Sequence, residues 1–330
     1  MTQAHSTYSR IVSKTALCAQ AFLFACGLFV IAASLVGFFG DIEILFDLFS
    51  HFHLQYTVIL ALSSALAFGL KKPQLAWIFA GTSACNAAML LMLWIPQGTP
   101  KADLTQPSQS ISILNMNLNY DNRRPDMVVA EIERLKPDVL VLEELTPSLF
   151  SGMKAALDKF KYSNYVLRPD PYGIGIFSHL PMTNKSTDPL DLVIPLVMRA
   201  DITVGKTNVA VFGVHTLTPL VQRNCDFNNT LADRLTAYRS KLPKSVVLIG
   251  DMNATPWSHT FRRLLATNEF VDSERGFGLQ CSWPYDRLQL LMIPIDHAFV
   301  TPDISVVTRE LGHDDGSDHL PLFVRLTIPQ

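Results

Sequence analysis

Gly316-Ser317-Asp318-His319-Leu320-Pro321, near the end of the chain, is the most informative stretch of this sequence. A second informative stretch comes earlier in the chain, where the apolar run Val246 to Ile249 is followed by Gly250-Asp251-Met252-Asn253. In both places an acid and a His or Asn stand beside an apolar β-like run, where loops usually present catalytic side chains. Carboxylates combined with imidazole and amide groups predict metal-assisted phosphate chemistry.

Further apolar runs of β character surround this pair. They cover residues 111–116, 138–142, 173–178, 208–214, 245–249, 295–300 and 321–327. Helical patterns fall between some of them, at 125–136, 147–160 and 226–241. Mixed strands and helices with long connections predict an α/β domain whose large sheets are covered by helices. About 220 residues is enough for one core of this kind.

The first hundred residues are different in character. The chain is 48% hydrophobic with a mean hydropathy of +0.22, and the apolar excess lies at this end. No Asp, Glu, Lys or Arg occurs between Lys14 and Asp41, between Asp47 and Lys71, or between Lys72 and Lys101. Each window can supply the roughly 20 residues that cross a bilayer core. We therefore predict three transmembrane helices, near 16–39, 52–70 and 74–95.

Two alternatives concern these windows. The first could be a cleaved signal peptide, because Arg10 and Lys14 precede it, but its apolar run is longer than a signal core and two more windows follow. The second contains Ser63, Ser64 and Gly69, and could belong to a helical hairpin that only dips into the bilayer.

Charged residues near the windows predict the topology. Basic residues precede the first window and fill the turn after the second, whereas the loop between the first two is acidic. Since Lys and Arg are retained on the cytoplasmic side, the N-terminus is expected inside and the C-terminal domain outside. The predicted organisation is a membrane anchor at 1–100, a polar linker at 101–110 and a catalytic domain at 111–330.

The charge balance of the C-terminal domain argues against a nucleic-acid partner, and its cysteines leave a disulfide open. After residue 100 acidic residues slightly outnumber basic ones, so no basic stripe for a nucleic-acid backbone is visible. Membrane lipid and a small or lipid-borne phosphate are the favoured partners. Cys225 and Cys281 lie outside the predicted helices, and an oxidising compartment would allow a disulfide that the sequence cannot establish.

Polar residues stand at the ends of other predicted strands. Asn117, Glu143-Glu144 and His215 follow such runs, and Asp296 interrupts another. Taken singly, each has a plain structural explanation, such as a turn, a solvated strand end or a satisfied core histidine. A buried Asp296 requires a partner, and a His is the natural candidate.

Together these segments resemble the endonuclease/exonuclease/phosphatase superfamily, which includes deoxyribonuclease I. The resemblance covers about 110–328 and rests on ordered blocks: Ile113 to Asn117, Asp138 to Glu144, Tyr172 to Pro181, Val214-His215, Gly250 to Asn253 and Ser317 to Pro321. It implies a four-layer αββα sandwich, here preceded by the three helices. The anchor is similar to that of bacterial membrane-bound members, including a group associated with teicoplanin resistance.

The resemblance also implies a role for each matched residue. Asn117, Glu144 and Asp318 would hold or orient a divalent metal, and oxygen ligands suit Mg²⁺ or Mn²⁺. The remaining matched residues would act on the phosphate and its attacking water: Asp251 and Asn253 at the water, His319 oriented by Asp296 as base or cation, and His215 at a phosphoryl oxygen.

The chain departs from the family pattern at two positions. Asn119 stands where some repair nucleases of the family carry an acid, which argues against a repair function. Glu143 replaces a common Gln, which leaves either glutamate as the metal ligand, although the register favours Glu144.

Three functions follow, in order of preference. The first is a metal-dependent phosphohydrolase in the bacterial inner membrane, with its catalytic domain on the periplasmic side and a lipid-linked or envelope phosphate as substrate. The second is an extracytoplasmic nuclease, and the third a non-catalytic binding or sensor module. Trp257, Phe277 and Trp283 are candidate aromatics at the rim of the site, although ordinary packing explains each at least as well.

Overall fold

A computed structural model describes residues 2–97, 108–191, 197–285 and 289–330. The chain divides into two compact units, a helical unit at Met1–Leu91 and an α/β unit at Met92–Gln330. The expected linker at 101–110 lies mostly outside the described residues, and the first strand already begins at Ser108.

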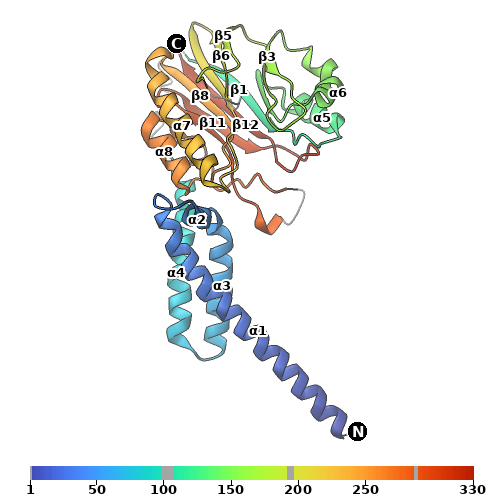
Figure 1. Ribbon diagram of the computed structural model, residues 1–330, viewed down its shortest axis with the longest axis vertical. Helices are drawn as coiled ribbons and strands as arrows, with labels where there is room; N and C mark the ends of the chain where they lie inside the picture. Colours follow the sequence, from blue (N-terminus) through green and yellow to red (C-terminus); the bar gives the residue numbers. More distant parts are fainter. Residues whose placement is uncertain (1, 98–107, 192–196, 286–288) are drawn as a thin grey trace. The chain divides into compact units, whose positions relative to one another are not determined.

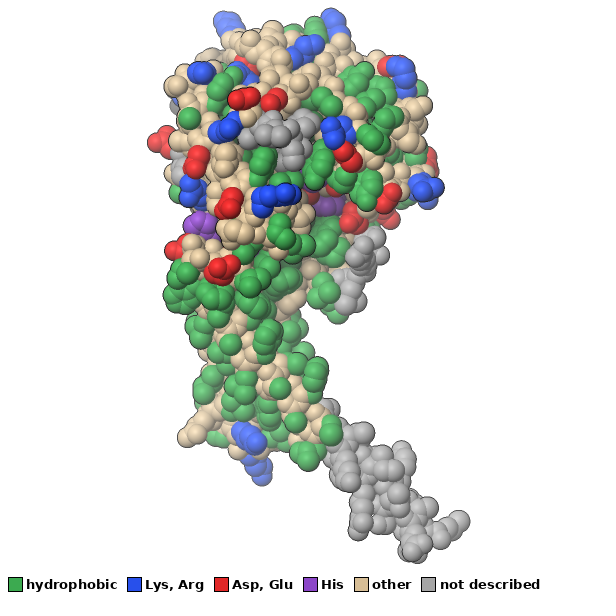
Figure 2. All heavy atoms as spheres, viewed as in Figure 1, with side chains coloured by type: hydrophobic (Ala, Val, Ile, Leu, Met, Phe, Trp, Pro, Cys, Tyr) green, Lys and Arg blue, Asp and Glu red, His purple; other side chains and the backbone are tan. Residues whose placement is uncertain are grey.

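The helical unit contains three long apolar helices among its described residues, α1 (Thr2–Val36), α3 (His53–Gly69) and α4 (Pro73–Leu91), and the short helix α2 (Ile44–Leu48), all labelled in Figure 1. Its 3-10 turns lie at Gly37–Phe39 and Phe49–Phe52, and a further 3-10 turn at Met92–Trp94 begins the α/β unit. Three segments are long and apolar enough to cross a membrane: Gln20–Phe39, Ile44–Gly69 and Pro73–Trp94. The second starts earlier than predicted because α2 and its 3-10 turn continue into α3. Hydrophobic side chains cover much of this unit in Figure 2.

Polar side chains connect the three long helices from within. His53 Nδ1 lies 2.6 Å from Asn86 Oδ1, and Asn86 Nδ2 donates to Ser34 Oγ at 3.1 Å. These residues come from α3, α4 and α1, and all are buried. Hydrogen bonds of this kind tie helices together where lipid offers no partner.

Two sheets of six strands form the α/β unit. The first has the order β11-β12-β1-β2-β4-β3 and the second β5-β6-β7-β8-β10-β9. The strands are β1 (Ser108–Asn117), β2 (Val139–Glu143), β3 (Tyr162–Val166), β4 (Ile174–Ser178), β5 (Met182–Ser186), β6 (Val197–Val204), β7 (Thr207–Val214), β8 (Ser245–Asp251), β9 (Val271–Asp272), β10 (Asp296–Val300), β11 (Ser305–Leu311) and β12 (Leu322–Pro329). The helices are α5 (Pro125–Leu135), α6 (Pro147–Leu157), α7 (Gln222–Tyr238) and α8 (His259–Asn268), with 3-10 turns at Arg239–Lys241 and Gln289–Leu291.

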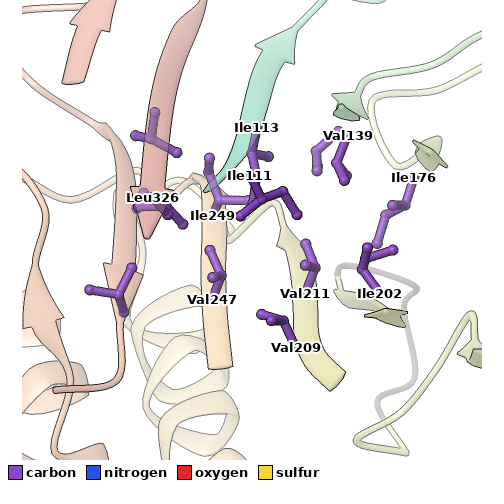
Figure 3. Packing of buried hydrophobic residues seen from close by; sticks show 14 of the residues in the cluster. Ile111, Ile113, Val139, Ile176, Ile202, Val209, Val211, Val247, Ile249 and Leu326 are labelled. Atoms are coloured by element: carbon purple, nitrogen blue, oxygen red, sulfur yellow. The ribbon is translucent and has the colours of Figure 1, made fainter. Parts of the chain in front are cut away.

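The sheets pack face to face over an apolar core. Figure 3 shows Ile113 and Val139 of the first sheet meeting Val211, Val247 and Ile249 of the second. Each of these side chains is fully buried, and burying one such side chain contributes about 1.5–3 kcal/mol. Separate clusters lie under α5 and α6 on the first sheet and under α7 and α8 on the second. The unit is therefore an α/β sandwich of four layers, as the resemblance implied.

The strand directions bring the predicted site residues to one edge. β1 and β2 are parallel, as are β7 and β8, so the carboxyl ends of each pair coincide. β10 runs antiparallel to β8, and Asp296 at its start lies opposite Asp251 at the end of β8. This arrangement gathers residues from distant parts of the chain at one edge of the two sheets.

Cysteines form no disulfide among the described residues: Cys225 is buried and Cys281 is half-buried. The disulfide left open by the sequence is not formed in this structure.

Candidate active site

Asp251 is the centre of the predicted site. Its Oδ2 accepts hydrogen bonds from Asn117 Nδ2 at 3.1 Å and from Asn253 Nδ2 at 3.2 Å. The Nε2 atoms of His215 and His319 lie 3.6 and 3.8 Å from the same oxygen. Strand ends β1, β7 and β8 and the loop before β12 thus converge on one buried carboxylate.

Glu144 lies on the other side of Asn117. Its Oε1 accepts from Asn117 Nδ2 at 3.2 Å and lies 3.9 Å from His215 Nε2, and its Oε2 accepts from the backbone N–H of Tyr120 at 2.8 Å. Its side chain is 15% exposed and its φ is +56°, a conformation uncommon outside glycine. Asn117 therefore orients two carboxylates at once.

Glu143 is turned into the interior of the sandwich. It is fully buried, and its Oε1 accepts from Asn115 Nδ2 at 2.6 Å inside the sandwich. Burial, together with the charges of Asp296 and Asp251, raises the pKa of Glu143 well above its usual range. Of the two glutamates that the sequence left open, Glu144 is the one that faces the predicted site.

His319 is held between two acids. Its Nδ1–H donates to Asp296 Oδ2 at 2.9 Å, and both side chains are under 10% exposed. Burial lowers the pKa of His319, but the charge and hydrogen bond of Asp296 and the charge of Asp251 outweigh burial and raise it to about 10. Burial raises the pKa of Asp251 to about 7, against the opposing charge of His319. The arrangement favours an imidazolium at His319 and a proton acceptor at Asp251.

Backbone contacts fix the loops that carry these residues. Thr216 N donates to Asp251 O at 2.9 Å, and Asn253 Nδ2 donates to Thr216 O at 3.0 Å. Gly250 has a φ of +152°, and a Cβ there would lie 1.9 Å from Val214 O. Glycine is therefore required where β7 and β8 approach each other, and the end of β8 is set firmly beside His215.

Asp318 joins the site through two residues that the sequence did not connect with it. Asn119 Nδ2 donates to Asp318 Oδ1 at 2.9 Å, while the Asn119 backbone N–H donates to Asn117 Oδ1 at 3.0 Å. Trp283 Nε1 donates to Asp318 Oδ2 at 2.9 Å. The unusual Asn119 and the aromatic Trp283 were both visible in the sequence, but their shared target was not. Trp257, another predicted rim aromatic, is instead buried.

A second acid–histidine group lies behind the site. Asp272, Glu274 and His297 bring ligand-type atoms within 4.8 Å of one another, and all three are buried. The Arg309 guanidinium lies 3.9 Å from Glu274 Oε2 and donates to Asp296 O at 3.0 Å. This interior group supports the strand that carries Asp296 and is closed to solvent.

A cavity of about 580 Å³ includes Tyr120, whose backbone N–H donates to Glu144. Its lining also includes Arg123 from the loop after β1, Thr146 at the N-cap of α6, and Ser148 in the first turn of α6. These side chains are mostly polar, which suits a hydrophilic group bound next to the carboxylates.

The donor set fits a hard divalent cation. Glu144 and Asp251 contribute carboxylates at Asn117, Asp318 is linked to Asn117 through Asn119, and no cysteine takes part among the described site residues. Mg²⁺ and Mn²⁺ prefer such ligands.

Comparison with known proteins places these features in a family. The model of the endonuclease/exonuclease/phosphatase family matches residues 113–319. No curated protein matches the chain. The predicted likeness to the teicoplanin-resistance-associated group is not tested and stays a prediction.

Solved structures share the fold at low identity. A family protein from Bacteroides thetaiotaomicron has 14% identity and a TM-score of 0.57, over 68% of this chain and 100% of that one. An AP endonuclease from Archaeoglobus fulgidus has 18% identity and a TM-score of 0.53, over 65% and 98%. The 3′ phosphatase NExo from Neisseria, solved as a variant bound to a product DNA hairpin, has 19% identity and a TM-score of 0.55. The match covers 65% of this chain and 98% of that one.

Proposed function

Because this chain belongs to the endonuclease/exonuclease/phosphatase family, we propose that it is a membrane-anchored, metal-dependent phosphohydrolase acting on a lipid-linked or other envelope phosphate. The observation that carries the proposal is the cluster around Asp251. The Asp251 carboxylate accepts hydrogen bonds from two amide side chains and lies close to two imidazole rings, which come from separate strand ends and loops. Asn117, one of the two amides, also donates to Glu144.

Glu144 and Asp318 are the residues that we expect to hold the metal, with Asn117 beside them. A bound divalent ion neutralises phosphate charge and makes water a better nucleophile. Asn117 donates to both Glu144 and Asp251, so its amide fixes the spacing between the metal-side and water-side carboxylates. Its part is to orient them.

Asp251 is the residue that we assign to the attacking water. Asn117 and Asn253 hold its Oδ2, and the Asn253 backbone N–H donates to Oδ1 at 2.8 Å. These neutral donors orient the carboxylate and leave it able to accept a proton from water.

His319 and His215 are assigned to the phosphoryl oxygens. His319 already gives its Nδ1–H to Asp296, so only its Nε2–H, which lies on the Asp251 side, remains for substrate. A positive ring at this point stabilises charge that develops on phosphate. Burial lowers the pKa of His215, which favours a neutral donor there.

Lipid-linked phosphate is preferred as substrate because of the helical unit. Three helices long and apolar enough to cross a membrane belong to the same chain, and anchoring gives a domain a high effective concentration toward lipid head groups. The basic residues before the first span and at Lys71 and Lys72 support an extracytoplasmic α/β unit.

The test is phosphate release by the purified full chain in detergent, with Mg²⁺ or Mn²⁺, from polyprenyl pyrophosphate, phospholipids and single- and double-stranded DNA. Asp251→Asn is the matched control. Metal-dependent release from a lipid, abolished in the variant, supports the proposal. Cleavage confined to DNA would replace it with a nuclease, an alternative favoured by the resemblance to the Neisseria phosphatase bound to DNA.

A further inference from the structure

The carboxylate of Asp318 is held on both oxygens by neutral N–H donors from different parts of the chain. Asn119 Nδ2 reaches Oδ1 from the loop after β1, and Trp283 Nε1 reaches Oδ2 from the segment before β10, both at 2.9 Å. The backbone adds to this, because Tyr285 N donates to Asp318 O at 2.8 Å and Leu320 N donates to Ser282 O at 2.9 Å.

Trp283 is itself firmly placed. Its backbone pairs with Ile293 in an antiparallel bridge, with Ile293 N donating to Trp283 O at 2.6 Å and Trp283 N to Ile293 O at 3.2 Å. Its ring is half-buried and lies 6.3 Å from the His319 ring between centroids. An indole has one donor only, and here that donor is directed at a carboxylate of the site instead of at solvent.

We propose that Trp283 is a positioning residue for Asp318, acting together with Asn119 to fix the rotation of its carboxylate for metal binding. The terminal torsion of an aspartate is broad, so a donor on each oxygen removes freedom that a single donor would leave. Each oxygen keeps a second lone pair that can face the metal or its waters. The proposal rests on the metal site of the proposed function.

Neutral donors suit this task. An Arg or Lys at either place would cancel the charge of Asp318 and compete with a cation for it. An indole and an amide orient the carboxylate and leave its charge available. An acid at position 119 would instead place like charge against Asp318, so the unusual Asn119 and Trp283 belong to one arrangement.

Trp283→Phe tests the proposal, because it keeps an aromatic ring and removes the N–H. Mn²⁺ binding to the purified full chain in detergent is measured by the loss of free Mn²⁺ signal in electron paramagnetic resonance, with Glu144→Ala identifying the site. Partners one shell out from the metal typically change its affinity about 10–100-fold, and we expect Trp283→Phe to weaken binding about tenfold. Trp77→Phe, the same change at an exposed residue of α4, should leave binding unaltered.

Asn119→Ala removes the other donor and should weaken Mn²⁺ binding in the same direction, which keeps the test valid if Trp283→Phe unfolds. Normal Mn²⁺ affinity in a folded Trp283→Phe chain overturns the proposal and leaves Trp283 a packing residue. Absence of Glu144-dependent Mn²⁺ binding in the wild type overturns it as well. Weakened binding without hydrolysis of any tested phosphate would retain the positioning role and reject the proposed activity.

Discussion

The α/β unit contains two buried acid–histidine pairs, Asp296–His319 at the site and Glu274–His297 in the interior, and the pKa of the histidine is shifted in opposite directions in the two pairs. At the site, Asp296 accepts a hydrogen bond from His319 at 2.9 Å, and the pKa of His319 is raised to about 10. In the interior, Glu274 Oε2 lies 3.6 Å from His297 Nδ1, and the pKa of His297 is lowered to about 3, by burial first and by the charge of Arg309 second. Asp296 and His297 are neighbours in sequence, yet they belong to opposite pairs.

Their neighbours explain the difference. His319 faces Asp296 and Asp251, so a positive ring is stabilised on both sides. His297 donates its Nε2–H toward Ala254 O and Pro294 O, and Arg309 already supplies the positive charge nearby. Burial disfavours charge in both places, so the count of surrounding acids and cations decides which histidine is charged.

Among the substitutions at the site, Asp251→Asn should cause the largest loss of phosphate release. It removes the proton acceptor while keeping the shape of the side chain, and such groups contribute about 10²–10⁴-fold to rate. Phosphate release by the full chain measures the loss. Glu274→Gln is the matched interior change and should retain most activity. Equal losses in the two variants would erase the distinction between site and interior carboxylates.

Asp296→Asn should convert His319 toward the behaviour of His297. Without that charge the pKa of His319 falls, so the imidazolium is lost at a lower pH and the alkaline limb of the pH–rate profile moves to lower pH. We expect about a hundredfold loss at pH 8, with partial recovery in acid. An alkaline limb that stays in place would show that His319 does not act as a cation.

Much of this arrangement could be predicted from sequence. Continuous apolar runs identified β1, β2, β4, β7, β8, β10 and β12, because strands covered on both faces contain few polar residues. β6 was missed because Arg199 and Asp201 interrupt its pattern. They pair with each other at 2.8 Å while buried. β3 and β5 were missed because they are polar strands at sheet edges.

The site itself was predictable only as a set of residues. Strand ends indicated which side chains gather, and the contacts around Asp251 agree with that set. The inward turn of Glu143 and the target of Trp283 were not predictable, because both depend on contacts between segments far apart in the chain. Sequence spacing carries no information about them.

Glu144→Gln and Glu143→Gln sharpen the comparison at adjacent residues. Glu144 faces the site, and neutralising this expected ligand should lower metal affinity by more than the about 10–100-fold that partners one shell out from a metal contribute. Glu143 is buried with its pKa raised well above the usual range, so a neutral amide resembles the side chain already present. Its replacement should change Mn²⁺ binding and phosphate release little. A large loss in Glu143→Gln alone would assign the metal to the other glutamate.

Glu274→Gln, finally, should affect stability without affecting chemistry. Burial raises the pKa of Glu274 to about 7, opposed by Arg309, whereas the unfolded chain has the ordinary value of about 4.3. Between these values the folded state holds a proton that the unfolded state has lost. Stability therefore falls as pH rises through this window, by at most about 1.4 kcal/mol per pH unit, and levels off above it.

A glutamine at position 274 cannot ionise, and its amide can donate to His297 Nδ1, for which no described residue is a hydrogen-bond donor. Thermal unfolding of the full chain at pH 5, 6 and 7 should consequently show a weaker decline in the variant than in the wild type. Parallel curves for the two proteins would mean that Glu274 stays ionised beside Arg309. The interior carboxylate would then be ionised like Asp296 at the site, and burial would not distinguish the two acids.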